Sequence, residues 1–284
     1  MVTPFHDDGS LDLVTARRLA RYLVDVQRND ALVINGTTGE APTTSEDEKV
    51  ALVAAVKEEV GPQVKIVAGV GTFNTAHSVE LARQAEQAGA DGLLVVTPYY
   101  SLPPQRGIIA HFLAIADATA LPCILYDIPH RAGRPIETAS LIELAQHPHI
   151  VAVKDAKKDP VASAQVMAAT DLAYYSGDDG MTLPLLAVGG VGVVGTSTHF
   201  TGAKMRQLID LFVAGRLEEA IALNAALLPV FTGVFATQGC TMVKSGLKHL
   251  GLLPNDVLRS PMVSATDAEA AAFAALLEAA DLSG

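Results

Sequence analysis

Short apolar runs recur along the chain, and a segment with helical periodicity follows each of them. The runs are too short for helices and do not alternate with polar residues, a pattern typical of strands covered on both faces. They span residues 31–35, 64–70, 92–97, 122–126, 150–154, 172–176 and 190–195, with amphipathic segments between them such as 44–60, 76–88 and 105–119. The alternation predicts parallel crossovers and therefore an α/β fold.

The regular spacing of these runs favours a closed (β/α)8 TIM barrel over an open sheet, and such a barrel needs an eighth strand. Only residues 1–5 are available for the first strand, which we therefore expect to be truncated or unusually short. After about residue 200 the strand pattern gives way to helical segments at 203–214, 217–228, 238–250 and 265–280. The sequence thus predicts a barrel domain over residues 1–215 and a C-terminal helical region over 216–284.

Composition narrows the class of partner. Of the 284 residues 50% are hydrophobic and 18% are charged, which suits a protein with a large buried core. The net charge of -11 argues against nucleic acid and against an anionic membrane surface as partners. The two cysteines, Cys123 and Cys240, lack metal-ligand spacing and are expected to be small buried side chains in a reducing compartment. Because no apolar run reaches the length of a membrane span and no secretion signal opens the chain, we expect a cytoplasmic protein.

Lys154 directly follows the apolar run 150–153, at the end of a predicted strand where a barrel places its site. Lysine is rarely buried, and burial would lower the pKa of its amine and make it a nucleophile for a carbonyl group. The alternative, a lysine that reaches solvent or pairs with Asp155, stays open from sequence alone. Asp127, at the end of another strand, is predicted to be a hydrogen-bonding residue and not a catalytic base.

Other strand ends carry groups that fit the same chemistry. The phenol of Tyr126 could move protons through neighbouring hydroxyl groups, for which the candidates are Thr37, Thr38, Tyr99 and Tyr100. Arg131, in the following loop, could bind a carboxylate through two parallel hydrogen bonds. Each of these residues taken alone is more often a core, interface or exposed loop residue, so the prediction depends on several strand ends agreeing.

Two motifs point to other chemistry and are set aside. Residues 190–195 match the spacing G-x-G-x-x-G, but here the match itself is predicted to be a strand, whereas a dinucleotide site needs these glycines between a strand and a helix. The acids Asp155, Asp159, Asp178 and Asp179 could suggest a divalent metal. No histidine joins them at a ligand spacing, and helix capping explains Asp178 and Asp179, so no metal site is predicted.

The same strand ends carry a family resemblance. In order, the chain reads VTPFHDDGSLD, NGTTGEAPTTSEDEK, VTPYYSLPPQRG, ILYDIPHRAGRPI, VAVKDAKKD and YYSGDD. These segments closely resemble the dihydrodipicolinate synthase and N-acetylneuraminate lyase family of class I aldolase-like enzymes. The likeness runs from residue 2 to about residue 262, and six motifs in order make it specific.

The resemblance implies a role for each strand end. Lys154 would form a Schiff base with pyruvate, so that neither a metal nor an organic cofactor is expected. Tyr126, Thr37 and Tyr100 would form a proton relay, with Tyr100 reaching across a tight dimer interface in a homotetramer. Thr37 and Thr38 would hold the pyruvate carboxylate, Gly177 and Val194 would lie near the keto acid, and Arg131 would bind the carboxylate of the second substrate.

The implied reaction joins pyruvate to L-aspartate 4-semialdehyde and gives 4-hydroxy-tetrahydrodipicolinate, a step of lysine and diaminopimelate biosynthesis. Sialic acid lyases usually lack an arginine at the position of Arg131, which favours this reaction. The alternatives are another pyruvate-dependent aldolase or dehydratase acting on a sialic acid or a keto-deoxy sugar acid, a catalytically silent homologue, and a nucleotide-binding oxidoreductase.

Some positions depart from the family pattern. The usual extension before VTPF is missing, and Gly195 stands where a serine is common. Members inhibited by lysine often carry two histidines after the GTTGE motif, where this chain has Glu46 and Lys49. We therefore expect weak or absent feedback inhibition by lysine.

Overall fold

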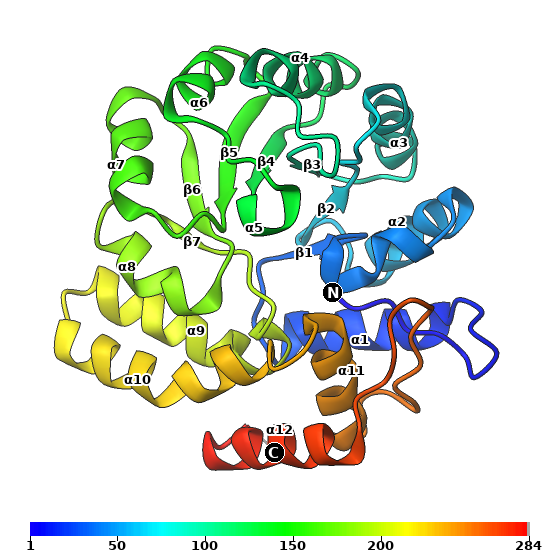
Figure 1. The fold of residues 1–284 in the computed structure, drawn as a ribbon. Coiled ribbons are helices and arrows are strands. Elements are labelled where there is room, and N and C mark those ends of the chain that lie inside the picture. Colours follow the sequence, from blue (N-terminus) through cyan, green and yellow to red (C-terminus); the bar gives the residue numbers. More distant parts are fainter. Residues whose placement is uncertain (283–284) are drawn as a thin grey trace. The chain divides into compact units, whose positions relative to one another are not determined.

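The computed structural model describes residues 1–282, which fall into two compact units (Figure 1). One unit is the continuous segment Ile66–Gly195, and the other combines Met1–Lys65 with the segment that begins at Thr196. The predicted boundary at residue 215 falls in the turn between two helices of this second unit. The two compact units therefore differ from the two predicted domains, 1–215 and 216–284. The division into those domains stays a prediction.

The continuous unit is built on a parallel sheet. Its strands are β2 (Lys65–Gly69), β3 (Gly92–Val96), β4 (Cys123–Asp127), β5 (Ile150–Asp155), β6 (Ala173–Ser176) and β7 (Gly192–Val193), each paired in parallel with the next. The crossovers contain α3 (Thr75–Gln87), α4 (Gln105–Ala116), α5 (Pro129–Ala132), α6 (Thr138–Leu144), α7 (Pro160–Ala169), the 3-10 turn η3 (Asp179–Met181) and α8 (Thr182–Leu186). In Figure 1, α3, α4, α6 and α7 follow one another along the outside of this sheet.

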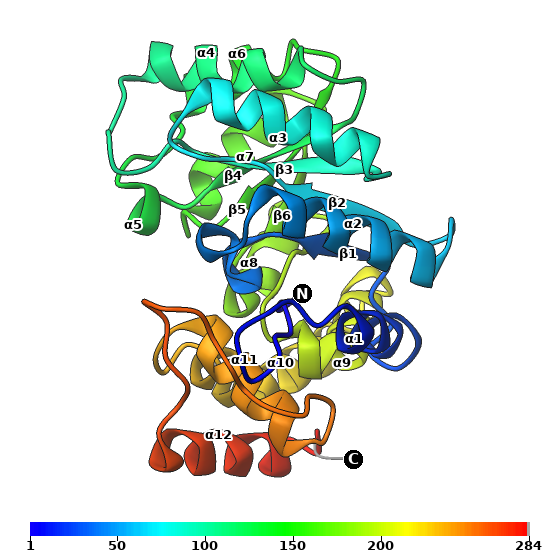
Figure 2. The same cartoon turned by 90° about the vertical axis from the view of Figure 1, so that its right-hand side faces the viewer.

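Among the described residues, the other unit contains β1 and the remaining helices. Its elements are α1 (Leu13–Asp25), β1 (Ala31–Ile34), η1 (Thr37–Gly39), η2 (Ala41–Thr43), α2 (Glu46–Val60), α9 (Thr198–Val213), α10 (Leu217–Gly233), α11 (Gly239–His249) and α12 (Asp267–Ala279). Helix α1 packs on α2, α9 packs on α10, and α12 packs on both α10 and α11 (Figure 2). The prediction of helices in the C-terminal part of the chain is therefore confirmed.

The apolar runs predicted the strands well. All of the runs become strands, with boundaries that differ by at most two residues at either end. The glycine-rich motif at 190–195 contains β7, so the prediction that this motif forms a strand is confirmed. Both Cys123 and Cys240 are free and buried, as predicted. Within the described residues, every helix is too short or too polar to span a bilayer.

The expected first strand is reduced to a single bridge. Within residues 1–5, only Phe5 makes a strand-like contact, an isolated antiparallel bridge to Leu11. Side chains and loop carbonyls satisfy the polar groups of this segment instead of a strand ladder. The N–H of Val2 donates to Nε2 of His199 at 3.1 Å, and the hydroxyl of Thr3 donates to the carbonyl of Gly39 at 2.6 Å.

Glycine permits the close packing of the C-terminal helices. A Cβ on Gly246 of α11 would lie 2.8 Å from ring atoms of both Phe200 and Phe273. These two rings, from α9 and α12, pack edge to face with centroids 5.6 Å apart. Any larger residue at 246 would push α11 away from both helices, so the packing of the three helices depends on this glycine.

Candidate active site

Lys154 lies on β5 between two tyrosines. The strand register places Tyr126 of β4 beside Lys154 and Lys154 beside Tyr175 of β6. Residues in register across neighbouring strands point to the same face, so the three side chains lie at one level. The Nζ atom of Lys154 is 4.2 Å from the centroid of the Tyr126 ring. The structure thus brings together the two residues on which the sequence prediction most depends.

The surroundings of Lys154 raise the fraction of the amine that is neutral. Burial lowers the pKa of Lys154 to about 8; the charge of Asp179 opposes this shift, and the charge of Arg131 adds to it. Relative to an ordinary lysine, a shift of this size raises the neutral fraction near pH 7 about 300-fold. The alternative pairing with Asp155 is not found, because that carboxylate accepts hydrogen bonds from the backbone N–H of Lys157 at 2.7 Å and from the hydroxyl of Ser163.

Gly177 leaves room for the lysine stem. A Cβ on this residue would lie 3.0 Å from Cγ of Lys154 and 3.1 Å from Cβ of Ala156. The other residue predicted to lie near the keto acid, Val194, follows β7 and donates its N–H to the carbonyl of Ser176 at 2.8 Å. Gly177 thus lies against the Lys154 side chain and Val194 lies at a neighbouring strand end, while their contact with a substrate stays a prediction.

Arg131 lies on the short helix α5, and its guanidinium is exposed. Its charge lowers the pKa of Lys154 and also that of Tyr126, so it acts on both groups. Burial has the larger effect on the Tyr126 hydroxyl and raises its pKa, which keeps this phenol protonated at neutral pH. Arg131 therefore contributes a positive charge to the surroundings of both Lys154 and Tyr126.

The two tyrosines after β3 differ in their surroundings. The ring of Tyr99 packs edge to face on Phe73, with centroids 5.5 Å apart. Tyr100 has a positive φ of 70° and is 91% exposed. A large aromatic side chain that is this exposed belongs to a residue type enriched at protein interfaces. The predicted part of Tyr100 in a proton relay stays a prediction.

Thr37 and Thr38 belong to the other unit, in the 3-10 turn η1 that follows β1. The hydroxyls of Thr38 and Thr196 are 3.4 Å apart. The turn ends at Glu40, which adopts a left-handed conformation with φ of 56°. The Glu40 carboxylate is fully buried and accepts a hydrogen bond from Nζ of Lys244, on α11, at 2.5 Å. This ion pair fixes the segment that carries both threonines to the C-terminal helices.

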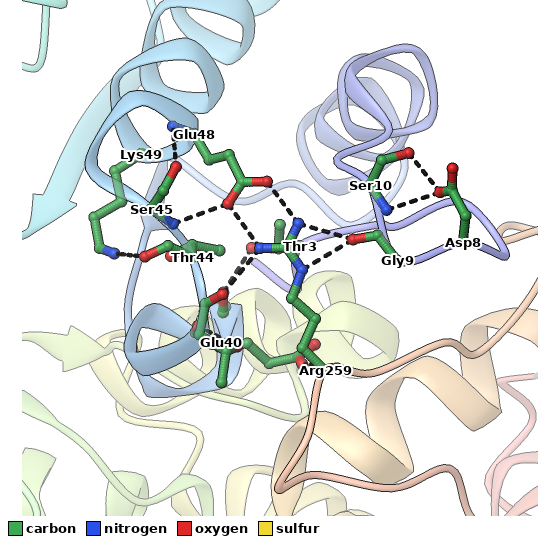
Figure 3. Close-up of polar contacts among 12 residues, drawn as sticks. Thr3, Asp8, Gly9, Ser10, Glu40, Thr44, Ser45, Glu48, Lys49 and Arg259 are labelled. Carbon is green, nitrogen blue, oxygen red and sulfur yellow. Dashed lines mark hydrogen bonds and ion pairs between the residues drawn. The ribbon is translucent and has the colours of Figure 1, made fainter.

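Arg259 holds the same segment from a second direction (Figure 3). Its backbone N–H donates to Oε2 of Glu40 at 3.0 Å. Its guanidinium donates to both oxygens of Glu48 and to the carbonyls of Gly9 and Thr43. The Arg259 hydrogen bonds lower the pKa of Glu48 to about 2, so this ion pair persists at any ordinary pH.

Sequence reasoning missed three features of the site. Tyr175 was not singled out, because only the strand register shows that it lies beside Lys154. Asp179 was explained as a helix-capping acid, yet its charge acts on Lys154. Asp178 does cap η3, accepting from the N–H of Gly180 at 3.0 Å, as predicted. The third missed feature is the ion pair between Asp127 and Lys157, which follows β5. No spacing in the sequence indicates that these two residues meet.

Residues 1–280 match the model of the dihydrodipicolinate synthetase family. A curated 4-hydroxy-tetrahydrodipicolinate synthase from Cutibacterium acnes is 59% identical over 282 residues, which cover 99% of this chain and 96% of that protein. A solved dihydrodipicolinate synthase from Bacillus anthracis is 38% identical with a TM-score of 0.95, covering 98% of this chain and 95% of that one. One from Cyanidioschyzon merolae with lysine bound is 37% identical with a TM-score of 0.96, covering 99% and 96%. The fold is thus a TIM barrel with C-terminal helices, and the chain belongs to the dihydrodipicolinate synthetase family.

Proposed function

We propose that the chain condenses pyruvate with L-aspartate 4-semialdehyde through a Schiff base on Lys154. This is the activity of a 4-hydroxy-tetrahydrodipicolinate synthase, a lyase of the class I aldolase type in lysine and diaminopimelate biosynthesis. The observation that carries the proposal is the desolvated amine of the half-buried Lys154 side chain, with its lowered pKa, against the ring of Tyr126. A neutral amine beside a protonated phenol is what carbinolamine formation requires.

The reaction follows from the chemistry of this amine. The neutral Nζ of Lys154 attacks the keto carbon of pyruvate, and the carbinolamine loses water to give an iminium ion. The iminium accepts the electron pair left when the methyl group loses a proton, so an enamine forms without a metal or an organic cofactor. The enamine attacks the aldehyde carbon, and the amino group of the second substrate then displaces Lys154 as the ring closes.

The remaining residues would bind the substrates and move protons. We assign the proton relay to Tyr126, Thr37 and Tyr100, and the pyruvate carboxylate to Thr37 and Thr38. Gly177 and Val194 would line the pocket of the keto acid. Arg131 would bind the carboxylate of the aldehyde. Its exposed guanidinium and its effect on the Lys154 amine support this assignment.

The relay through Tyr100 requires a second subunit, and we propose a homotetramer built from two tight dimers. The 91% exposure of Tyr100 within one subunit supports this arrangement. The two substrates would be the only other partners, in the cytoplasm, without nucleic acid or membrane. Analytical ultracentrifugation gives the subunit number, and a Tyr100→Phe variant that stays assembled but turns over slowly would support the relay.

The experiment that tests the Schiff base is mass spectrometry after incubation with pyruvate and sodium borohydride, followed by peptide mapping. We expect a reduced adduct on Lys154 and none in Lys154→Ala, whose circular dichroism should match that of the wild type. An adduct on another lysine, or none, would refute the mechanism. Turnover of pyruvate with L-aspartate 4-semialdehyde by the untreated enzyme, compared with its cleavage of sialic or keto-deoxy sugar acids, then identifies the aldehyde.

A further inference from the structure

A buried carboxylate lies directly behind Tyr126. Asp127 is the last residue of β4, is 1% exposed, and points to the sheet face opposite Tyr126 because successive strand residues alternate. Its Oδ1 accepts the N–H of Ile136 at 3.1 Å. Its backbone carbonyl accepts the N–H of Ala156 at 2.8 Å. The Asp127 carboxylate therefore closes the base of the segment 128–136, which leaves the sheet and returns to it.

Lys157 compensates the charge of this carboxylate. Its Nζ is 3.4 Å from Oδ2 of Asp127, and its side chain is only 13% exposed. Oδ2 has no hydrogen-bond partner among the described residues, so Lys157 is what offsets its loss of hydration. Burial and the neighbouring Asp155 raise the pKa of Asp127 to about 6, while Lys157 and the Ile136 N–H oppose the rise. Asp127 is therefore ionised at neutral pH.

The segment closed by Asp127 carries Arg131. Helix α5 forms its first part, and its far side is held by the loop after β3 and by the first residue of α4. Arg134 donates from Nε to the carbonyl of Leu102 at 2.8 Å, and Gln105 donates from Nε2 to the carbonyl of Pro135 at 2.9 Å. Because the Arg131 side chain is exposed, its position is set mainly by the backbone of this segment.

We propose that the Asp127–Lys157 ion pair positions Arg131 for the carboxylate of the aldehyde substrate. The inference rests on the proposed function, in which Arg131 binds that carboxylate. Asp127 and Lys157 are positioning residues, because they act through the backbone that carries Arg131. Lys154, in contrast, is held by the strand ladder on both sides. The pair should therefore set the affinity for the aldehyde and leave the formation of the pyruvate adduct unchanged.

The test is a double-mutant cycle on KM. Three variants are compared with the wild type: Lys157→Met, Arg131→Ala and the double variant. For each we measure the KM of L-aspartate 4-semialdehyde, the KM of pyruvate and the rate at which the borohydride-trapped adduct forms. We expect each single change to raise KM of the aldehyde about tenfold or more, since small misplacements of binding groups have effects of this size. KM of pyruvate and the adduct rate should stay within about twofold. The double variant should be no worse than Arg131→Ala alone, because the pair acts through Arg131.

A second variant keeps the inference testable if Lys157→Met fails to fold. Asp127→Asn removes the charge but keeps an acceptor for the Ile136 N–H, so circular dichroism should be normal while KM of the aldehyde rises. Asp117→Asn is the matched control, because its exposed carboxylate makes only a surface pair with His147 at 3.0 Å.

Additive effects in the double variant, or equal rises in both KM values, would overturn the inference and assign the pair a purely structural role. If the wild type gives no pyruvate adduct on Lys154, the proposed function itself fails. If the adduct forms and Arg131→Ala raises KM of the aldehyde while Lys157→Met does not, only the inference fails.

Discussion

Replacing Lys244 by methionine should destabilise the protein far more than the same change at Lys248, one turn further along α11. The side chains of Lys244 and Glu40 are each 1% exposed, and their charged atoms are 2.5 Å apart. The Lys244 amine also donates to the carbonyl of Val257 at 2.7 Å and lies 4.2 Å from the centroid of the Phe5 ring. Methionine has a similar volume but offers neither a charge nor a donor.

The magnitude follows from what the variant leaves behind. Lys244→Met would leave the Glu40 carboxylate buried, and among the described residues the backbone N–H of Arg259, at 3.0 Å from Oε2, would still donate to it. Removing one partner of a buried ion pair lowers the free energy of unfolding by about 3–5 kcal/mol. Lys248 pairs with Asp256 at 2.8 Å, but its side chain is 50% exposed, and such surface pairs contribute about 0–1 kcal/mol.

Urea denaturation at one fixed protein concentration measures both variants against the wild type, since assembly would make stability depend on concentration. Glu40→Gln combined with Lys244→Met should lose less than the two single changes added together, because no uncompensated charge remains. If Lys244→Met costs no more than Lys248→Met, the buried pair does not hold the segment 36–44, and the reasoning is refuted.

Three further results are expected. The rate of pyruvate adduct formation should fall about tenfold per pH unit below pH 8, because only the neutral Lys154 amine attacks; a rate that is flat between pH 6 and 8 would contradict the pKa of about 8. Gly177→Ala should slow adduct formation, because the added Cβ would lie 3.0 Å from Cγ of Lys154 and overpacking of this kind costs about 1–3 kcal/mol. An unchanged rate in the borohydride assay would show that the Lys154 side chain has room for the methyl group. Millimolar L-lysine should inhibit turnover weakly or not at all, because Glu46 and Lys49 stand where lysine-inhibited members of the family often carry histidines. Strong inhibition in an activity curve would refute this.

Much of the fold could be predicted because strands covered on both faces have a strong sequence signal. The run 150–154 is apolar up to Lys154, and β5 follows it with one residue added. The first strand could not be predicted in the same way. Residues 1–5 satisfy their polar groups through His199 and Gly39, which are remote in sequence and give no local pattern.

The site was predictable where chemistry and strand end coincide, as at Lys154 and Tyr126. Residues that act on the site through their neighbours could not be predicted from the sequence. Glu40 and Lys244 are 204 positions apart, and nothing in the periodicity of α11 indicates that one of its lysines is buried against a glutamate. Tyr175 depends on the register of β6 against β5, which the length of the apolar run does not fix.

Under the proposed assignments, the segment 128–136 would let the recognition of the aldehyde carboxylate change while the position of the Lys154 amine stays the same. The hydrogen-bond ladder of the sheet fixes Lys154. Arg131, in contrast, lies on the segment 128–136, whose two ends meet at Asp127. Under the proposed assignments, an insertion or exchange within this segment would alter which carboxylate Arg131 binds and would leave Lys154 in place. A related enzyme could therefore acquire a new aldehyde substrate, by evolution or by grafting, through this one segment, provided that its two ends still meet at the Asp127 carboxylate.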